Sequence, residues 1–204
     1  YAVYLNNTLI PGILQLMIFL VTVFSIGMEI KRSTTKEWLS VGSDSLWVSL
    51  IGKLLPHTVV FTLVGFLAAA VLYAYNAYPL HSGWLPMLAA IFLLVIASQA
   101  VGVFMIGVLP TPRLGLSFAS LFGMISFSIV GFSFPVQGMH PTLQALAYLF
   151  PLRHYFLIYV DQALNGRDLY YTMGEYLWLL AFLVLPVLIG KNLKRALREF
   201  KYIP

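Results

Sequence analysis

Five long apolar runs dominate the chain, and most of its polar residues gather in the stretches between them. The runs cover residues 9–28, 47–75, 84–109, 114–134 and 173–190. One helix needs about 20 consecutive apolar residues to cross a bilayer core, and the first four runs reach that length. The fifth run is shorter but still falls within the range of membrane helices. The pattern predicts an all-α fold: a polytopic helical membrane protein with five transmembrane helices in one domain, residues 1–204.

The composition agrees with this prediction. Hydrophobic residues make up 60% of the chain and charged residues only 9%, whereas about 25% of an ordinary soluble domain is charged. The mean hydropathy is +0.89. The chain has no cysteine, which excludes disulfides and thiolate metal sites within it. His140 and His154 stand too isolated for a metal site, which takes three or four converging ligands, so we expect no metal and no cofactor.

The distribution of basic residues predicts how the helices are oriented. If the polar segment 29–46 lies in the cytoplasm and the spans alternate, only Arg153 and Arg167 fall on the outer side. The other basic residues then lie on the inner side: Lys31, Arg32, Lys36, Lys53, Arg113, Lys191, Lys194, Arg195, Arg198 and Lys201. Cytoplasmic loops of membrane proteins carry an excess of Lys and Arg. We therefore expect a cytoplasmic C-terminus, and we attribute the net charge of +5 to topology rather than to a nucleic-acid patch.

The same orientation places Tyr1 outside the cytoplasm, although no basic region of a signal peptide precedes the first run. An upstream segment would be needed to deliver this end across the membrane. We expect the chain to be a C-terminal fragment that lacks the first span and an outer domain. The full chain would then have six transmembrane helices.

The charged segment between the first two runs predicts a cytoplasmic helix over residues 29–42. It carries both signs of charge beside apolar residues, so it can dock as an amphipathic helix in a groove of a soluble partner. Its candidate contact residues are Glu29, Lys31, Arg32, Thr34, Thr35, Lys36, Glu37, Trp38 and Leu39. The alternative is a solvated loop that binds nothing.

The stretch between the fourth and fifth runs, residues 132–166, is unusual. It is rich in proline and contains a short apolar helix, 142–150, that cannot cross a membrane. Broken backbone at membrane depth is tolerated only against protein or a wet cavity. The stretch therefore predicts a re-entrant hairpin on the outer side, followed by a second outer helix. Beyond the last run, residues 191–204 predict an amphipathic cytoplasmic tail that rests on anionic lipid.

Two sets of motifs resemble those of type-2 ABC exporter permeases. The cytoplasmic segment matches the Gly-Thr-x-Glu-x-Leu core of that family's coupling region at Thr35, Glu37 and Leu39, with Thr34 in place of the glycine. A Gly-Lys pair follows at Gly52-Lys53. The outer stretch carries the second set: Phe134-Pro135, Met139-x-Pro141, Leu143-Gln144, Leu149-x-Pro151-Leu152 and Gly166.

The resemblance implies the permease subunit of an ATP-driven exporter in the bacterial inner membrane, with the segment 29–39 coupled to an ABC ATPase subunit. A second permease copy, or a paralogue, would complete a dimer in the lipid bilayer. The outer hairpin would form an exit gate through Phe134, Pro135, Met139, Pro141 and Pro151. ATP and magnesium would be bound by the partner, because Gly52-Lys53 lacks the first glycine and the Ser or Thr of a phosphate loop. The chain itself is not expected to be an enzyme.

Large side chains in and after the fourth run are candidates for lining an apolar translocation path: Phe118, Phe122, Met124, Phe127 and Phe132. Core packing or contact with lipid is the alternative for each of them. Small residues at four-residue spacing, such as Ser98/Gly102 and Ala119/Gly123, let helices approach closely. They fit a dimer seam and packing within the chain equally well.

An ion- or proton-coupled carrier is the alternative function. It predicts ionisable residues buried inside the spans, and the centres of the runs carry almost none. His57 lies near the inner end of the second run and is expected to pack there. Arg153, His154 and Asp161 are expected on one polar face of the outer helix, and Glu175 at the outer end of the last span. An intramembrane enzyme is disfavoured, because no metalloprotease, serine-hydrolase or paired-carboxylate motif is found.

Overall fold

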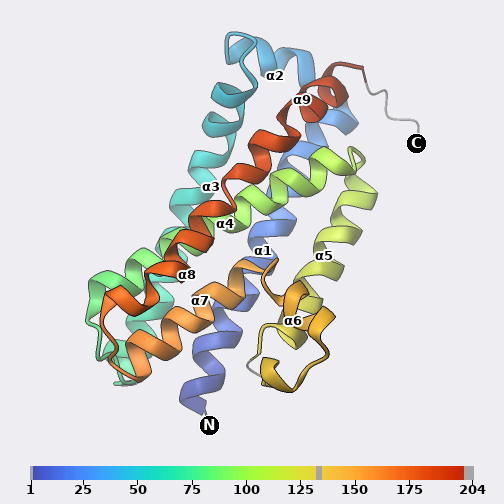
Figure 1. The fold of residues 1–204 in the computed structure, drawn as a ribbon. Coiled ribbons are helices and arrows are strands. Elements are labelled where there is room, and N and C mark those ends of the chain that lie inside the picture. The colour runs from blue at the N-terminus through green and yellow to red at the C-terminus, as the bar shows by residue number, and fades with distance from the viewer. Residues whose placement is uncertain (1, 132–134, 200–204) are drawn as a thin grey trace.

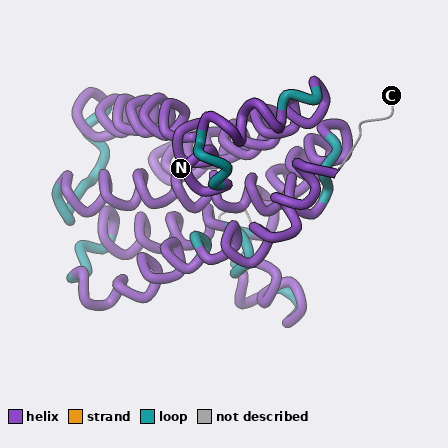
Figure 2. The backbone as a smooth tube through the Cα atoms, turned by 90° about the horizontal axis from the view of Figure 1, so that it is seen from above, coloured by secondary structure: helices purple, strands orange, loops and turns teal. Residues whose placement is uncertain are grey.

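The protein folds as a bundle of helices joined by short loops (Figures 1 and 2). The computed structural model describes residues 2–131 and 135–199, and every element in this part of the chain is helical. In chain order the elements are α1 (Ala2–Arg32), α2 (Thr35–Val41), α3 (Leu46–Ala69), η1 (Ala70–Tyr75), α4 (Trp84–Val108), α5 (Pro112–Ile129), η2 (Val136–Gly138), α6 (Pro141–Ala147), α7 (Pro151–Ile158), η3 (Tyr159–Leu164), α8 (Leu169–Ala181) and α9 (Val184–Glu199). Of the short elements, η1 and η3 are π-helical and η2 is a 3₁₀ turn.

The helices confirm the predicted fold class. Five segments are long and apolar enough to cross a membrane: Leu5–Arg32, Leu46–Tyr75, Trp84–Val108, Pro112–Ile129 and Leu169–Arg198. α2 and the end of α9 lie at one end of the bundle, whereas the N-terminus and α6 lie toward the other (Figure 1). We call these the α2 end and the hairpin end, and we call residues 135–164 the hairpin segment.

Helix α4, the third of the five spans, forms the centre of the bundle. In its most apolar stretch 72% of the residues are buried, compared with 22% in the second and last spans. Small residues allow the helices to approach one another closely, as is common between membrane helices. A Cβ added to Gly102 would come within 2.8 Å of Thr22 on α1, and one added to Gly123 within 2.5 Å of Leu16. These two glycines therefore serve helix contacts within the chain.

The first helix begins well before the predicted start at residue 9, and Pro11 lies inside it. The polar residues that precede the apolar run find partners on other elements. Asn7 accepts a hydrogen bond from the Tyr73 hydroxyl at 2.7 Å, and Asn6 donates to the Tyr78 hydroxyl at 3.1 Å. Buried polar groups are tolerated where they are hydrogen-bonded, so the helix extends through this polar stretch.

The last span is broken in its middle, whereas the sequence predicts one run over 173–190 and a separate tail. α8 ends at Ala181 and α9 begins at Val184. The break lies at Phe182, four residues before Pro186. Pro186 has no N–H to donate to the Phe182 carbonyl, and its ring clashes with that carbonyl. α9 then continues to Glu199 without interruption, so residues 191–199 of the predicted tail belong to the same helix as the end of the last span.

The segment 29–42 is also divided differently from the prediction. Residues 29–32 end α1, and α2 starts only at Thr35. Between them Ser33 has a φ of 58°, in the left-handed region that ends a right-handed helix. The predicted cytoplasmic helix is therefore the single short element α2, and its predicted first turn belongs to a membrane span.

The fourth span ends at Ile129, earlier than the predicted residue 134. Gly131 follows with a φ of 109°, which only glycine adopts readily. Phe132, predicted to line the path, and Phe134, predicted to form part of the gate, lie outside the described residues.

Candidate functional site

Buried apolar side chains anchor α2 to the membrane helices. Leu39 is only 1% exposed and belongs to the same core cluster as Ile30 of α1 and Leu46 of α3. Thr35 at the start of α2 is also buried. Burying one leucine side chain contributes about 1.5–3 kcal/mol, so α2 is held against the bundle as a rigid element.

An ion pair between α1 and α3 lies beside α2 and contacts it. Glu29, at the end of α1, lies 2.5 Å from Nζ of Lys53 on α3 and accepts a hydrogen bond from the Thr34 hydroxyl. Lys53 also lies 5.2 Å from the centre of the Trp38 ring, which is a cation–π contact. We call Glu29, Thr34, Trp38, Leu39 and Lys53 the α2 junction. It joins α2 to two spans at once.

The other face of this region is exposed and charged. The nine predicted coupling residues divide into two groups. Glu29, Thr34, Thr35, Trp38 and Leu39 are buried or half-buried, whereas Lys31, Arg32, Lys36 and Glu37 are exposed. Val41, at the end of α2, is 87% exposed and adds an apolar tip that sequence reasoning missed. One group therefore holds the helix in place and the other is open to a partner.

A further contact at this end was also missed. Lys194 Nζ of α9 donates to the Asp44 main-chain carbonyl at 2.8 Å, and Arg198 pairs with the Asp44 carboxylate at 2.8 Å. Leu193 and Leu197 are 0% and 2% exposed and lie in the same core cluster as Leu39. The two leucines of the predicted amphipathic tail therefore pack against the protein, whereas its contact with anionic lipid stays a prediction. Helical spacing identifies an apolar face, but not which surface covers it.

The predicted gate residues lie at two levels of the hairpin segment. Pro141 and Pro151 begin α6 and α7, where the missing N–H of proline is not needed. Pro135 and Pro141 are exposed, Met139 is half-buried and Pro151 is buried. The side chain of Gln144 donates to the Met139 carbonyl at 2.9 Å and stabilises the turn before α6.

The start of α7 enters the bundle. Gln15, within α1, accepts a hydrogen bond from the Leu152 main-chain N–H at 2.8 Å and donates to the Ser126 hydroxyl of α5 at 3.3 Å. Gln15 and Leu152 are fully buried. A helix start at membrane depth needs such a protein partner, because lipid offers none. A re-entrant hairpin would need such a contact, and the re-entrant path itself stays a prediction.

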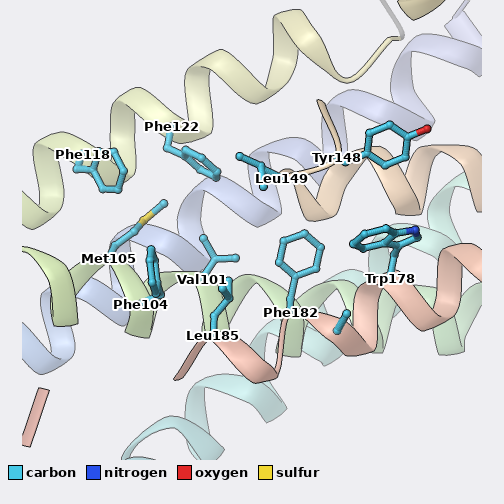
Figure 3. Close-up of a pocket in the computed structure, with 11 residues that line it drawn as sticks. Val101, Phe104, Met105, Phe118, Phe122, Tyr148, Leu149, Trp178, Phe182 and Leu185 are labelled. Atoms are coloured by element: carbon cyan, nitrogen blue, oxygen red, sulfur yellow. The ribbon is translucent and has the colours of Figure 1, made fainter. Parts of the chain in front are cut away.

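Aromatic side chains surround a cavity of about 380 Å³ between the helices (Figure 3). Phe118 and Phe122 of α5 line it, together with Phe104 of α4 and Trp178 of α8. Tyr148, just after α6, lines it on the side of the hairpin segment. The lining is almost entirely apolar.

The residues predicted to line a path are not brought together on one surface. Phe118 and Phe122 line this cavity, whereas Met124 is 62% exposed. Phe127 packs against Gly12 of α1. A second hollow of about 570 Å³ opens between α1 and α5, lined by Leu20, Val21, Phe24, Leu116, Ser117 and Ser120. Sequence reasoning missed this hollow, because it needs the pairing of two helices far apart in the chain.

The ionisable residues near the hairpin end each bind a different part of the structure. Arg153 donates to a carbonyl at the end of α5 at 3.3 Å, and Asp161 pairs with Arg167 at 3.2 Å. His154 instead contacts Glu175 on α8 at 2.6 Å. Within the ranges 2–131 and 135–199, no three metal-binding side chains lie close enough together to hold an ion.

A comparison with protein families decides the class of this protein. The model of a family described as "ABC-2 family transporter protein" matches residues 1–190. The chain belongs to this family. It is a multi-pass membrane permease of the ABC transporter type, as the motifs predict, and permeases of this family normally work with an ATPase subunit. No curated protein and no solved structure matches the chain.

Proposed function

We propose that this permease is the membrane subunit of an ATP-driven exporter and that a separate ABC ATPase drives transport by moving α2. The α2 junction is the observation that carries the proposal. One side of α2 is packed into the core through Leu39, and it contacts the Glu29–Lys53 pair of α1 and α3 through Thr34 and Trp38. The other side presents Lys36 and Glu37 to the surroundings. A helix placed in this way is suited to transmit a load from a soluble partner.

The contacts around α2 connect it to three spans. Glu29 joins α2 to the end of α1, Lys53 belongs to α3, and Asp44 is bound by the side chains of α9. Energetic coupling between distant sites travels through such packed and hydrogen-bonded elements. Movement of α2 would therefore shift three membrane helices together.

The exposed residues suit a partner with both signs of charge. Lys31, Arg32 and Lys36 are basic, Glu37 is acidic, and all four are exposed. Charge complementarity contributes mainly specificity and rate of association. Val41 adds the apolar contact that charges alone do not provide.

The α2 end is the cytoplasmic end in this proposal, and the membrane is the bacterial inner membrane. The basic residues of α2 and of the end of α9 lie at this end, in agreement with the excess of Lys and Arg in cytoplasmic loops. The ATPase would bind ATP and magnesium there. The permease would contribute the path and no catalytic group.

The path itself would form between two permease copies, or between a copy and a paralogue. The hollow between α1 and α5 is open and mostly apolar. α1 carries both this hollow and Glu29 of the junction, so a movement of α2 would act directly on the path. The tip of the hairpin segment, with Pro135, Met139 and Pro141, would close the outer exit.

A photo-crosslinking experiment tests the ATPase contact. A photoreactive amino acid in place of Val41 should crosslink, in intact cells, to a protein that hydrolyses nucleotide. The matched control replaces Val59 on α3, which is 50% exposed but lies within a span, and it should label only lipid. If position 41 gives no protein adduct, or if both positions give the same adduct, the docking role of α2 is contradicted.

One observation favours the alternative, a proton-coupled carrier. His154 is fully buried and paired with Glu175 of the last span, and buried ionisable pairs mark proton pathways in many transporters. However, the spans carry no Asp, Glu, Lys, Arg or His between this pair and the inner-end residues of the α2 junction and His57. A proton relay across the membrane would need such groups. Uphill transport by the permease alone, driven by a pH gradient, would establish the carrier.

A further inference from the structure

A histidine at the hairpin end has both ring nitrogens in hydrogen bonds. His154 of α7 is 0% exposed. Its Nδ1 lies 2.6 Å from Oε2 of Glu175 on α8, and its Nε2 lies 3.1 Å from the Tyr148 carbonyl just after α6. The ring is stacked on Trp178, with 5.6 Å between the ring centres and 16° between the planes. This one side chain therefore joins three parts of the structure.

The partners of the ring determine how many protons it needs. A carbonyl oxygen only accepts a hydrogen bond, so Nε2 must carry a hydrogen. The short contact between Nδ1 and the carboxyl group needs one further hydrogen, on either the nitrogen or the oxygen. The pair is therefore an imidazolium with a carboxylate, or a neutral imidazole with a carboxylic acid. Both descriptions contain the same protons and have zero net charge.

We propose that His154 and Glu175 form a site for one exchangeable proton, and that this proton fastens the end of α6 to the last span through the Tyr148 carbonyl. We call Tyr148, His154 and Glu175 the outer latch. If the pair loses the proton, the neutral ring keeps only one N–H. Either Glu175 or the Tyr148 carbonyl then faces a nitrogen lone pair, and one of the two connections is lost.

The charged groups around the latch disfavour the addition of a second proton to the pair. Arg153 precedes His154 on α7 and lies 4.8 Å from the centre of the Tyr148 ring. A second proton on the pair would leave it with a net positive charge close to this guanidinium. Tyr148 is the other titratable group that faces His154, and the neighbours Trp178 and Phe182 do not titrate. The singly protonated pair is therefore the state in which charges and hydrogen bonds are both balanced.

The latch also holds Tyr148 in place as part of the wall of the aromatic cavity. Tyr148, Trp178 and Phe182 line this cavity (Figure 3), and all three rings lie within 6.1 Å of the His154 ring, measured between ring centres. Release of Tyr148 would open the cavity toward the hairpin segment. The assignment of this movement to an exit gate rests on the proposed function. The number of protons on the His154–Glu175 pair does not depend on it.

Trp178 provides a direct readout of the proton. An imidazolium stacked on indole quenches its fluorescence more strongly than a neutral imidazole. The chain has four tryptophans, so the emission of Trp178 is the difference between the wild type and a Trp178→Phe variant, both in lipid nanodiscs. We expect this emission to rise reversibly as the pH is raised, and His154→Gln to abolish the rise.

Two variants of Glu175 separate the proton from the contact. In Glu175→Gln the side-chain amide donates to Nδ1 of a neutral His154, so both connections persist without the extra proton. In Glu175→Ala one connection is lost at every pH. Because the chain has no native cysteine, a spin label on a cysteine that replaces Leu149 reports the mobility of the end of α6.

The expected label is immobile at every pH in Glu175→Gln, mobile at every pH in Glu175→Ala, and more mobile at alkaline pH in the wild type. A wild-type label whose mobility does not change with pH, or a wild-type pH response in Glu175→Gln, would overturn the proposal. Neither readout involves transport or an ATPase. A failure of the latch is therefore distinguishable from a failure of the proposed function.

Discussion

Two ionic pairs join helices at opposite ends of the permease, and they differ in the groups that form them. Glu29 and Lys53 at the α2 junction are each about one-fifth exposed, at 21% and 19%, and a lysine ordinarily stays charged to about pH 10. In the outer latch His154 is fully buried and Glu175 is 24% exposed, and histidine is the side chain whose charge ordinarily changes near neutral pH. The α2 junction is therefore a permanent mechanical link, whereas the outer latch depends on a proton. The predictions below test this difference.

The largest effect is expected from Leu39→Ala. Truncating a fully buried leucine costs about 2–5 kcal/mol, and here the loss falls on the anchor of α2. We expect a lower unfolding temperature in detergent and faster proteolysis between α1 and α3. Val41→Ala is the matched control, because Val41 is 87% exposed. If both variants behave like the wild type, α2 is not held by its apolar face.

Breaking the Glu29–Lys53 pair should have the next largest effect. Lys53→Met leaves the Glu29 carboxylate without its partner, and removing a hydrogen bond to a charged group costs about 1–3 kcal/mol. The double variant Glu29→Gln/Lys53→Met should recover part of the stability, because no charge is left unpaired. Additive losses, measured by thermal unfolding at several pH values, would show that the two side chains do not interact. If the stability that Lys53→Met loses relative to the wild type changes with pH around neutrality, the permanent link is contradicted.

The two Glu175 variants should differ in stability as well as in mobility. Glu175→Ala leaves Nδ1 of His154 without a partner in a buried site, at a cost of about 1–3 kcal/mol. Glu175→Gln keeps a donor in the same place and should cost less. Unfolding by denaturant near neutral pH measures both. Equal losses would mean that packing, and not the hydrogen bond, explains the contact.

The smallest effect is expected from Asp44→Ala, which removes the ion pair between Arg198 of α9 and the loop after α2. The Arg198–Asp44 pair is exposed, at 48% and 68%, and exposed pairs contribute about 0–1 kcal/mol. The Lys194 hydrogen bond reaches the main-chain carbonyl of Asp44 and remains possible in the variant. A loss as large as that of Lys53→Met would identify α9 as a main support of α2.

The spans could be predicted from the sequence because they depend on local composition. A run of about 20 apolar residues crosses a bilayer whatever it packs against. The exposed half of α2 could be predicted for a similar reason, since its charges and spacing are local. The two breaks that were missed also have local causes, Ser33 in a positive-φ conformation and Pro186 inside the last span. The sequence signal of Pro186 was available, because an interior proline disrupts a helix.

The ionic and polar partners could not be predicted, because they are brought together by the packing of distant helices. Glu29 and Lys53 are 24 residues apart, and His154 and Glu175 are 21 residues apart. Gln15 reaches Leu152 across 137 residues. In each case the residue types allow many pairings, and only the arrangement of the helices selects one.

The central claim, that a soluble ATPase acts on the permease through the exposed charges of α2, is tested most directly by ATP turnover. The complex of the permease with the ATPase that crosslinks to position 41 would be compared in nanodiscs with the variants Glu37→Lys and Lys36→Glu. Both side chains are exposed, and exposed substitutions usually change stability by no more than about 0.5 kcal/mol. We predict that ATP turnover stimulated by the permease falls in both variants, while membrane insertion and unfolding temperature stay at wild-type values. Unchanged turnover in both variants would contradict the claim.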